Sequence, residues 1–407
     1  MSRRIHFHTD NYWFSGSETT LMVLLDAAWR DPSIEPQFTY RPWPEYTPGL
    51  HARLPAGVAA RPLELPDPEA FKTSLIGEGS GGLASAVRGA GRVLPLRKVS
   101  LALDLTRLTR LFEEERPDVV HVNNGGFPGA ISCTAAALAA ARAGVRSIVY
   151  VVNNLAHGYD RPGRWADWPV DRRLRDVVTR FVTGSEAAGR RLTEVLGLEP
   201  GKLEVINNTV LDRSAETSVS TVDVPADDLV LVVIARLEPR KGHTVLFDAL
   251  TRMTTDATVL VAGEGPERDA LEVAARTLGV GDRVRFLGHT PDIWPLLARA
   301  DALVLPSIGL EDFPIVVVEA MAASRAVVAS RVAGTVEQVV DDETGRLVPP
   351  GDPVALAAAL DDVLRDPDRR RRMGEAGRRR YEARYTAERV VGRYWALYDA
   401  LAAEGAG

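Results

Sequence analysis

Short apolar runs alternate with amphipathic helical segments along this chain, and the alternation occurs in two successive series. Runs that are apolar throughout are typical of strands in a parallel sheet, because helical crossovers cover both faces of such a sheet. Two doubly wound, Rossmann-like α/β domains are therefore expected. The strands are expected at residues 3–8, 119–123, 146–152, 180–185 and 202–208 in the first series, and at 229–236, 257–263, 283–288, 302–307 and 326–330 in the second.

A polar stretch without periodicity, roughly residues 211–228, separates the two series. The prediction is an N-terminal domain over residues 1–210 and a C-terminal domain over residues 211–385. Residues 41–95, rich in Gly and Pro, are expected to form no regular structure.

Composition narrows the class of protein. With 407 residues, 45% of them hydrophobic and 26% charged, the chain is expected to be a soluble globular protein of two domains. A net charge of −6 argues against nucleic acid as the main partner. Cys133 is expected to be buried in a helix. Because it is the single cysteine, no disulfide framework is possible within the chain, which favours a reducing cytoplasm. Neither a signal peptide nor a membrane-spanning run is expected.

Two glutamates flank the expected start of a helix at the binding edge of the second sheet. Glu311 follows the apolar run 302–307, and Glu319 lies eight residues further on. Pro314 suits the first position of a helix. The amides around three residues of the first turn are then expected to face an anion, while Glu319 accepts hydrogen bonds from a vicinal diol such as a ribose. These three residues are Phe313, Ile315 and Val316.

Two cations are expected at the same edge. Arg236 ends the first strand of the second series, and Lys241 follows five residues later, at the start of a helix. A pair of cations in that position suits a diphosphate group. Two solvated surface cations are the alternative.

Residues 229–352 resemble the C-terminal domain of family 4 retaining glycosyltransferases, which have the GT-B fold. The resemblance rests on ARLEPRKG, VAGEGPE, EDFPIVVVEAM and AGTVEQVVDDETGRLVPPGD, and above all on the Glu-x7-Glu pair Glu311 and Glu319. It implies two Rossmann-like domains facing across a cleft, with an acceptor-binding N-terminal and a donor-binding C-terminal domain. A last helix, within residues 386–407, is expected to cross back to the first domain.

The resemblance also implies roles for individual residues. Glu311 is expected to lie against the donor sugar and the reaction centre, and Glu319 to hold the nucleotide ribose. Arg236 and Lys241 are expected to hold the diphosphate. Replacing Glu311 by Gln should then lower turnover with little change in the donor Kd. The family usually has Glu-Gly-Phe-Gly where this chain has Glu-Asp-Phe-Pro, so Asp312 is expected to add a charge beside the sugar.

The N-terminal half resembles the family more loosely. Gly16 is expected to let the backbone approach the donor phosphates, with a plain turn glycine as the alternative. The family often has His-x-His and a further His where this chain has a set of asparagines. Asparagine is no general base but can hydrogen-bond a sugar hydroxyl. The residues expected to contact the acceptor are His121, Asn123, Asn124, Asn153 and Asn154, with a core position as the alternative for His121.

The function implied is a metal-independent, retaining, hexosyltransferase-like enzyme. It would use a UDP-, GDP- or dTDP-sugar as co-substrate, no cofactor, and a glycan, lipid-linked or small-molecule acceptor. Two alternatives stay open: a sugar-nucleotide 2-epimerase, and an inactive partner subunit that only binds nucleotide sugar. No metal-binding constellation is visible in the sequence, and the oligomeric state is left open.

A basic segment before the helix near residue 100 has two interpretations. Arg88, Arg92, Arg97 and Lys98 lie among apolar residues. They are either an interfacial segment that seeks anionic lipid or a solvated helix face. The expected location is accordingly the cytoplasm, with the inner face of the membrane as a peripheral contact.

Overall fold

The computed structural model of the chain describes residues 2–65, 96–160, 162–216, 224–309 and 311–404. The chain forms two compact units. Unit 1 consists of Met1–Gly184, Ala188–Ile206 and Val391–Gly407, and unit 2 of Ser185–Ala187 and Asn207–Val390.

Unit 1 is built on a parallel sheet with the strand order β3-β2-β1-β4-β5-β6-β7. The central strands β1, β4 and β5 are almost wholly apolar or buried, as strands covered on both faces must be. The strands are β1 (Arg3–Thr9), β2 (Ile34–Tyr40), β3 (Ala60–Pro62), β4 (Val119–Asn124), β5 (Ser147–Val152), β6 (Arg180–Thr183) and β7 (Leu203–Val205).

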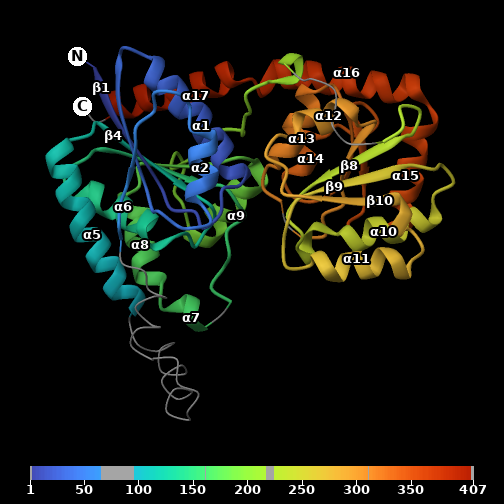
Figure 1. Cartoon of the computed structure of the whole chain (residues 1–407). Coiled ribbons are helices and arrows are strands. Elements are labelled where there is room, and N and C mark those ends of the chain that lie inside the picture. Colours follow the sequence, from blue (N-terminus) through green and yellow to red (C-terminus); the bar gives the residue numbers. More distant parts are fainter. Residues whose placement is uncertain (1, 66–95, 161, 217–223, 310, 405–407) are drawn as a thin grey trace, which may run out of the picture. The chain divides into compact units, whose positions relative to one another are not determined.

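Helices cover both faces of this sheet. Figure 1 shows α5, α6 and α8 together on one face and α1 on the other. Small alanine side chains on α6 allow close packing against α5, and Cys133 lies fully buried among them, as predicted. The helices are α1 (Gly16–Arg30), α2 (Thr47–Arg53), α5 (Leu96–Glu115), α6 (Ile131–Arg142), α7 (Pro162–Trp165), α8 (Trp168–Val177) and α9 (Glu186–Leu196).

Unit 2 has a second parallel sheet with the strand order β10-β9-β8-β11-β12-β13. The order reverses between β8 and β11, and ligands of open parallel sheets bind beyond the carboxyl ends of the strands at such a point. The strands are β8 (Val230–Ile234), β9 (Thr258–Ala262), β10 (Val284–Gly288), β11 (Ala302–Leu305), β12 (Ala326–Ser330) and β13 (Gly345–Val348).

Two apolar clusters hold the helices of unit 2 to the faces of its sheet. One cluster joins α10, α11 and α15 to one face, and the other joins α12 and α13 to the opposite face, as Figure 1 shows. The helices are α10 (His243–Arg252), α11 (Arg268–Thr277), α12 (Trp294–Arg299), α13 (Ile315–Ala322), α14 (Thr335–Gln338), α15 (Pro353–Arg365) and α16 (Pro367–Arg384). The last helix, α17 (Ala387–Glu404), begins in unit 2 and continues in unit 1. The predicted α/β class with two doubly wound sheets is confirmed.

Three strands are absent from the sequence-based prediction. β2 contains Pro36 and polar residues, β3 has three residues and β13 has four, so none carries a long apolar run. β2 pairs in parallel with β1, and β3 pairs in parallel with β2, so the two strands extend the sheet beyond β1. The expectation that residues 41–95 lack regular structure is wrong for α2 and β3, and residues 66–95 lie outside the described part.

The chain passes from unit 1 to unit 2 at Ile206–Asn207, ahead of the polar stretch near residues 211–228. Residues just after this point are tied to the end of α16. Thr209 donates a hydrogen bond to the carbonyl of Tyr385 at 2.6 Å, and Val210 forms a β-bridge with Thr386.

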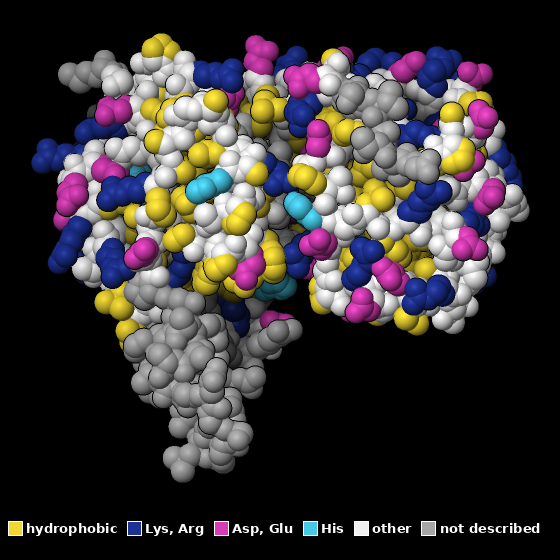
Figure 2. Space-filling model, in the orientation of Figure 1, with side chains coloured by type: hydrophobic (Ala, Val, Ile, Leu, Met, Phe, Trp, Pro, Cys, Tyr) yellow, Lys and Arg dark blue, Asp and Glu magenta, His cyan; other side chains and the backbone are white. Residues whose placement is uncertain are grey.

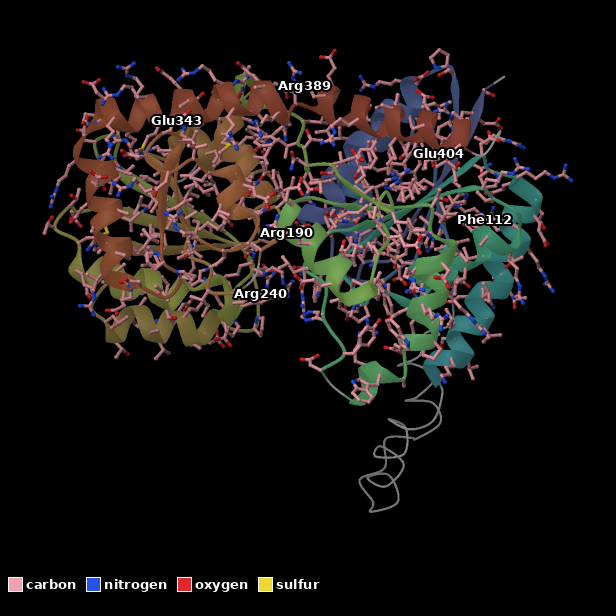
Figure 3. The ribbon with its side chains drawn as sticks, turned by 180° about the vertical axis from the view of Figure 1, so that it is seen from behind. Phe112, Arg190, Arg240, Glu343, Arg389 and Glu404 are labelled. Carbon is pink, nitrogen blue, oxygen red and sulfur yellow. The ribbon has the colours of Figure 1, made fainter. Side chains whose placement is uncertain are left out.

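Most of the last helix, α17, belongs to unit 1. Tyr398 on this helix is bonded to His121 on β4 at 2.7 Å. Glu404, labelled in Figure 3, pairs with Arg180 at 3.1 Å. These contacts join residues more than 200 positions apart, and they close the face of the unit 1 sheet on which α17 lies.

The surface carries charges of both signs. Figure 2 shows Lys and Arg side chains interspersed with Asp and Glu over the visible face. No helix in the described part combines the length and apolar character needed to cross a bilayer. Of the basic segment, Arg88 and Arg92 and the side chain of Arg97 lie outside the described part, while Lys98 is exposed on α5.

Candidate functional site at the carboxyl edge of unit 2

The candidate site begins where β8 and β11 end side by side. Because both strands are parallel, their carboxyl ends meet at the same edge of the sheet. Arg236 and the short 3-10 helix Pro239–Lys241 follow β8, and Ser307 and Glu311 follow β11. Residues some 70 positions apart in sequence are thereby brought together.

Glu311 is the centre of this group. One carboxylate oxygen, Oε1, accepts hydrogen bonds from Lys241 Nζ at 2.6 Å and from Ser307 Oγ at 2.8 Å, and lies 3.4 Å from Arg240 Nη1. The side chains of Glu311 and Lys241 are 8% and 13% exposed. Burial lowers the pKa of Lys241, and the Glu311 carboxylate offsets part of that effect.

A second carboxylate links the two remaining cations. Glu238 accepts from Arg236 Nε at 2.6 Å and from Arg240 Nε at 3.1 Å. Burial alone would raise the pKa of Glu238, but the two guanidinium groups lower it below the ordinary value. Three cations and two carboxylates therefore form one connected group. Arg240, labelled in Figure 3, joins both carboxylates.

Two glycines permit this local path of the chain. Gly242 has φ +69°, and a Cβ at this position would overlap the carbonyl oxygen of Pro306 at the end of β11. Gly263, after β9, has φ +145° and lies equally close to the carbonyl of Ala235. Both glycines let neighbouring strand ends approach one another.

The loop that carries Glu311 is held by residues distant in sequence. Gly334 N donates to the carbonyl of Glu311 at 3.1 Å, Asn208 to that of Phe313 at 3.2 Å and Gln338 to that of Pro314 at 3.0 Å. A Cβ on Gly334 would overlap the carbonyl oxygen of Asp312. These contacts fix the backbone of the loop on three sides.

Asp312 has a hydrogen-bond partner that is far from it in the sequence. It is buried, and its Oδ1 accepts a hydrogen bond from Ser185 Oγ at 2.6 Å. The next two amides, of Glu186 and Ala187, each donate to the carboxylate of Glu337 at 2.8 Å. The carboxylate of Asp312 thus contacts Ser185, and its expected place beside the donor sugar stays a prediction.

The helix α13 begins one residue later than predicted. Pro314 is its N-cap and Ile315 its first residue. Val317 N donates to Pro314 O at 3.2 Å. The amides of Ile315 and Val316 lie before this bond, in the first turn, where backbone N–H groups have no acceptor within the helix itself. Glu319 is half-buried on the same helix, one turn after Ile315.

The side chains of Phe313 and Val316 belong to the core. Phe313 is 4% exposed and packs edge-on against Tyr385 at 5.4 Å between ring centroids. Val316 is part of the same apolar cluster. Only the backbone groups of these two residues are therefore placed at the edge of the sheet.

In unit 1, Gly16 is the exposed first residue of α1, and the side chain two residues on is wholly buried. Glu18 accepts hydrogen bonds from Tyr46 Oη at 2.5 Å, Asn123 Nδ2 at 2.9 Å and Thr9 Oγ1 at 3.1 Å. Burial raises the pKa of Glu18, and these bonds offset part of the effect. The network fastens the start of α1 to β1 and β4.

The asparagines expected to bind the acceptor contribute to this network. Asn153 Nδ2 donates to Asn123 Oδ1 at 2.9 Å and to the carbonyl of Asn124 at 3.0 Å. Asn124 Oδ1 accepts from Ala130 N at 3.2 Å, and Asn154 Oδ1 accepts from its neighbour's amide at 2.9 Å. Asn123 and Asn124 are buried, and their role in acceptor binding stays a prediction.

His121 occupies a core position, which is the alternative considered for it. It is 1% exposed, and burial lowers its pKa to about 3. Its Nδ1 lies 2.7 Å from Tyr398 Oη on α17. An enclosed, neutral imidazole in this position holds the last helix to the sheet.

Known families match both halves of the chain. "Glycosyl transferases group 1" matches residues 216–380, and "Glycosyl transferase 4-like domain" matches residues 38–209. A glycogen synthase of Mycobacterium tuberculosis is 30% identical over 288 residues, which cover 68% of this chain and 67% of that protein. The chain belongs to the group 1 glycosyl transferases, of the family 4 type.

Other similar proteins agree with this family. A phosphatidyl-myo-inositol mannosyltransferase of Mycobacterium leprae is 34% identical over 230 residues, covering 54% of this chain and 59% of that protein. The chain thus spans less than two thirds of that relative. The crystal structure of Anabaena Alr3699/HepE in complex with UDP has a TM-score of 0.75 at 18% identity, covering 98% of this chain and 100% of that one. The predicted GT-B fold and family resemblance are confirmed.

Sequence reasoning missed several residues that the structure places around the candidate site. Arg240 and Ser307 contact Glu311, and their signal was only their place beside Lys241 and at the end of a strand. Ser185 and Glu337 gave no local signal, because their partners lie more than 100 residues away. Among the described residues, no His, Cys, Asp and Glu side chains gather in a group suited to a metal ion.

Proposed function

We propose that this chain is a retaining, metal-independent glycosyltransferase. It would move a hexose-like sugar from a UDP- or GDP-sugar to a hydroxyl group of a glycan, lipid-linked or small-molecule acceptor. The observation that carries the proposal is the group of three cations, Arg236, Arg240 and Lys241, at the carboxyl edge of the unit 2 sheet. Glu238 and Glu311 connect these cations to one another. Family membership supports it.

The donor diphosphate would lie against this group and the first turn of α13. Guanidinium and ammonium groups bind phosphate oxygens through charge-assisted hydrogen bonds. The amides of Ile315 and Val316 and the positive end of the helix would add to this field. Glu319, one turn along α13, would accept hydrogen bonds from the ribose diol.

These groups would neutralise the charge that develops on the leaving diphosphate. The bond between the anomeric carbon and the phosphate oxygen breaks, and its electron pair stays on that oxygen. The acceptor oxygen bonds to the anomeric carbon on the same face, and its proton passes to the leaving phosphate. Such a reaction needs no protein base, which is consistent with asparagines in place of the family's histidines.

Glu311 would act at the donor sugar. Its Oε1 is occupied by Lys241 and Ser307, whereas none of the hydrogen bonds described above uses its second oxygen, Oε2. A carboxylate beside the anomeric carbon stabilises positive charge that grows there in the transition state.

The free and fully buried Cys133 supports a reducing compartment for the protein.

The test starts with thermal unfolding of the full chain in a panel of UDP-, GDP- and dTDP-sugars. A bound donor at 100 times its Kd stabilises the folded state by about 2.7 kcal/mol. The donor that binds is then incubated with and without sugar acceptors, in the presence and absence of excess EDTA.

Transfer with retained anomeric configuration, unchanged by EDTA, is the expected result. An epimerised sugar formed without acceptor would establish the 2-epimerase instead. Binding of a nucleotide sugar without transfer or hydrolysis would indicate an inactive partner subunit. Loss of turnover in EDTA that magnesium or manganese restores would overturn metal independence.

A further inference from the structure

An aromatic cluster lies at the carboxyl edge of the unit 1 sheet. Tyr12 and Trp13 follow β1, and Trp43 follows the neighbouring strand β2. The ring centroid of Tyr12 lies 5.0 Å from that of Trp13 and 5.3 Å from that of Trp43. Tyr12 and Trp13 are 46% and 45% exposed. We call these three residues the aromatic platform.

A buried ion pair holds the platform in place. Trp43 donates its indole N–H to Asp10 Oδ1 at 2.7 Å, and the guanidinium of Arg41 lies 4.9 Å from the Trp43 ring centroid. Asp10 is fixed in turn by Arg41 at 3.4 Å and by Ser132 Oγ at 2.6 Å. Both charged side chains are less than 10% exposed. Rings held this way lose little conformational entropy when a ligand binds.

The polar residues once expected to hold the acceptor are engaged elsewhere. Asn123 and Asn153 bond to each other, and Asn123 also bonds to Glu18 inside unit 1. The aromatic platform instead presents exposed ring surface at the edge where ligands of open parallel sheets bind. Single exposed aromatics are ordinary, but two in ring contact, anchored through a third to a buried ion pair, form a prepared surface.

A sugar ring matches this surface. One face of a pyranose carries mainly C–H groups and covers a flat aromatic ring, while its hydroxyl groups remain at the rim for hydrogen bonds. We propose that the aromatic platform is an acceptor subsite, on which a pyranose ring of the acceptor stacks against Trp13 and Tyr12. This inference rests on the proposed function, because it names the class of acceptor: a sugar-containing molecule rather than a bare alcohol or a protein side chain.

The test compares Trp13→Ala, Trp13→Tyr and Trp165→Ala in the full chain. Trp165 on α7 is the matched control, since it is 70% exposed and lies outside the platform. Trp13→Ala is expected to raise the KM for a glycoside acceptor about tenfold and to leave donor hydrolysis without acceptor unchanged. Trp13→Tyr should restore most of the loss, and Trp165→Ala should match the wild type.

Direct binding separates failure of this inference from failure of the proposed function. Quenching of tryptophan fluorescence by methyl hexopyranosides and disaccharides is measured whether or not any transfer occurs. Saturable quenching that Trp13→Ala abolishes supports the subsite even in a protein without turnover. An unchanged acceptor KM and unchanged quenching in Trp13→Ala would overturn it. So would loss of binding to anionic phospholipid vesicles in Trp13→Ala without any change toward sugars, since that outcome marks a membrane contact.

Discussion

If the proposed function holds, Glu311 and an incoming diphosphate would compete for the same cations. Lys241 Nζ lies 2.6 Å from Glu311 Oε1, and Arg240 Nη1 lies 3.4 Å from the same oxygen. A donor phosphate must share these cations with the carboxylate or draw them away. Glu311→Gln keeps the shape of the side chain and an oxygen that can accept from Ser307, but it removes the negative charge.

The size of the effect follows from this geometry. Two unit charges 4 Å apart interact by about 4 kcal/mol at an effective dielectric constant of 20, before the cost of removing them from water is subtracted. The net contribution of a hydrogen bond to a charged group is about 1.5–3 kcal/mol. Because the phosphate shares Lys241 rather than replacing Glu311 fully, we expect a gain near the lower limit. Glu311→Gln should bind a nucleoside diphosphate about tenfold more tightly, which corresponds to about 1.4 kcal/mol. This replaces the sequence-based expectation of little change in the donor Kd, because the sequence did not reveal that Glu311 pairs with Lys241.

The same variant should turn over more slowly, because in the proposed mechanism the Glu311 carboxylate would stabilise charge that develops only in the transition state. Isothermal titration calorimetry with UDP, GDP and the bare nucleosides measures binding, and steady-state kinetics measures kcat. Glu319→Gln is the matched control: it should weaken donor binding through the ribose. The reasoning fails if Glu311→Gln binds the nucleoside diphosphate more weakly than the wild type. It also fails if the affinities for the nucleoside and for the nucleoside diphosphate change equally, because the cations then do not bind the diphosphate.

Other consequences of the structure can be measured separately. Arg236→Ala should weaken nucleoside diphosphate binding by about 1.5–3 kcal/mol in calorimetry, with the bare nucleoside much less affected; equal losses would contradict the assignment. Gly334→Ala should destabilise unit 2 by about 3 kcal/mol or more in urea unfolding, because its Cβ overlaps the carbonyl of Asp312. Gly392→Ala is the control, since no atom lies within 4 Å of its added Cβ on α17, and it should stabilise by about 0.5–1 kcal/mol. The pKa of His121, about 3 in the folded state against 6.5 ordinarily, means that the unfolded chain binds a proton first as the pH falls. The free energy of unfolding should therefore drop between pH 6.5 and 3 by up to about 1.4 kcal/mol per pH unit. In His121→Gln the unfolding midpoint, measured across this range, should depend less steeply on pH.

The sequence by itself determined the two parallel sheets and the place of the candidate site. Apolar runs such as 302–307 and 326–330 are local patterns, and burial on both faces of a sheet is enough to select them. Arg236 and Glu311 each follow such a run, so the parallel direction of the strands was enough to predict that they meet at one edge. The spacing of the two glutamates is also a local pattern, because both lie within one loop and the helix that follows it. It could therefore indicate the family without the structure.

Only the tertiary structure decided which partners these side chains have. Lys241 reaches Glu311 across 70 positions, and Asp312 reaches Ser185 across 127, so no local period could reveal either contact. The buried asparagine network depends in the same way on the packing of strands that meet only in the folded chain. The strands β2, β3 and β13 also depend on tertiary structure. Their sequences are polar or short and do not predict a strand, and pairing with neighbouring strands supplies their hydrogen bonds.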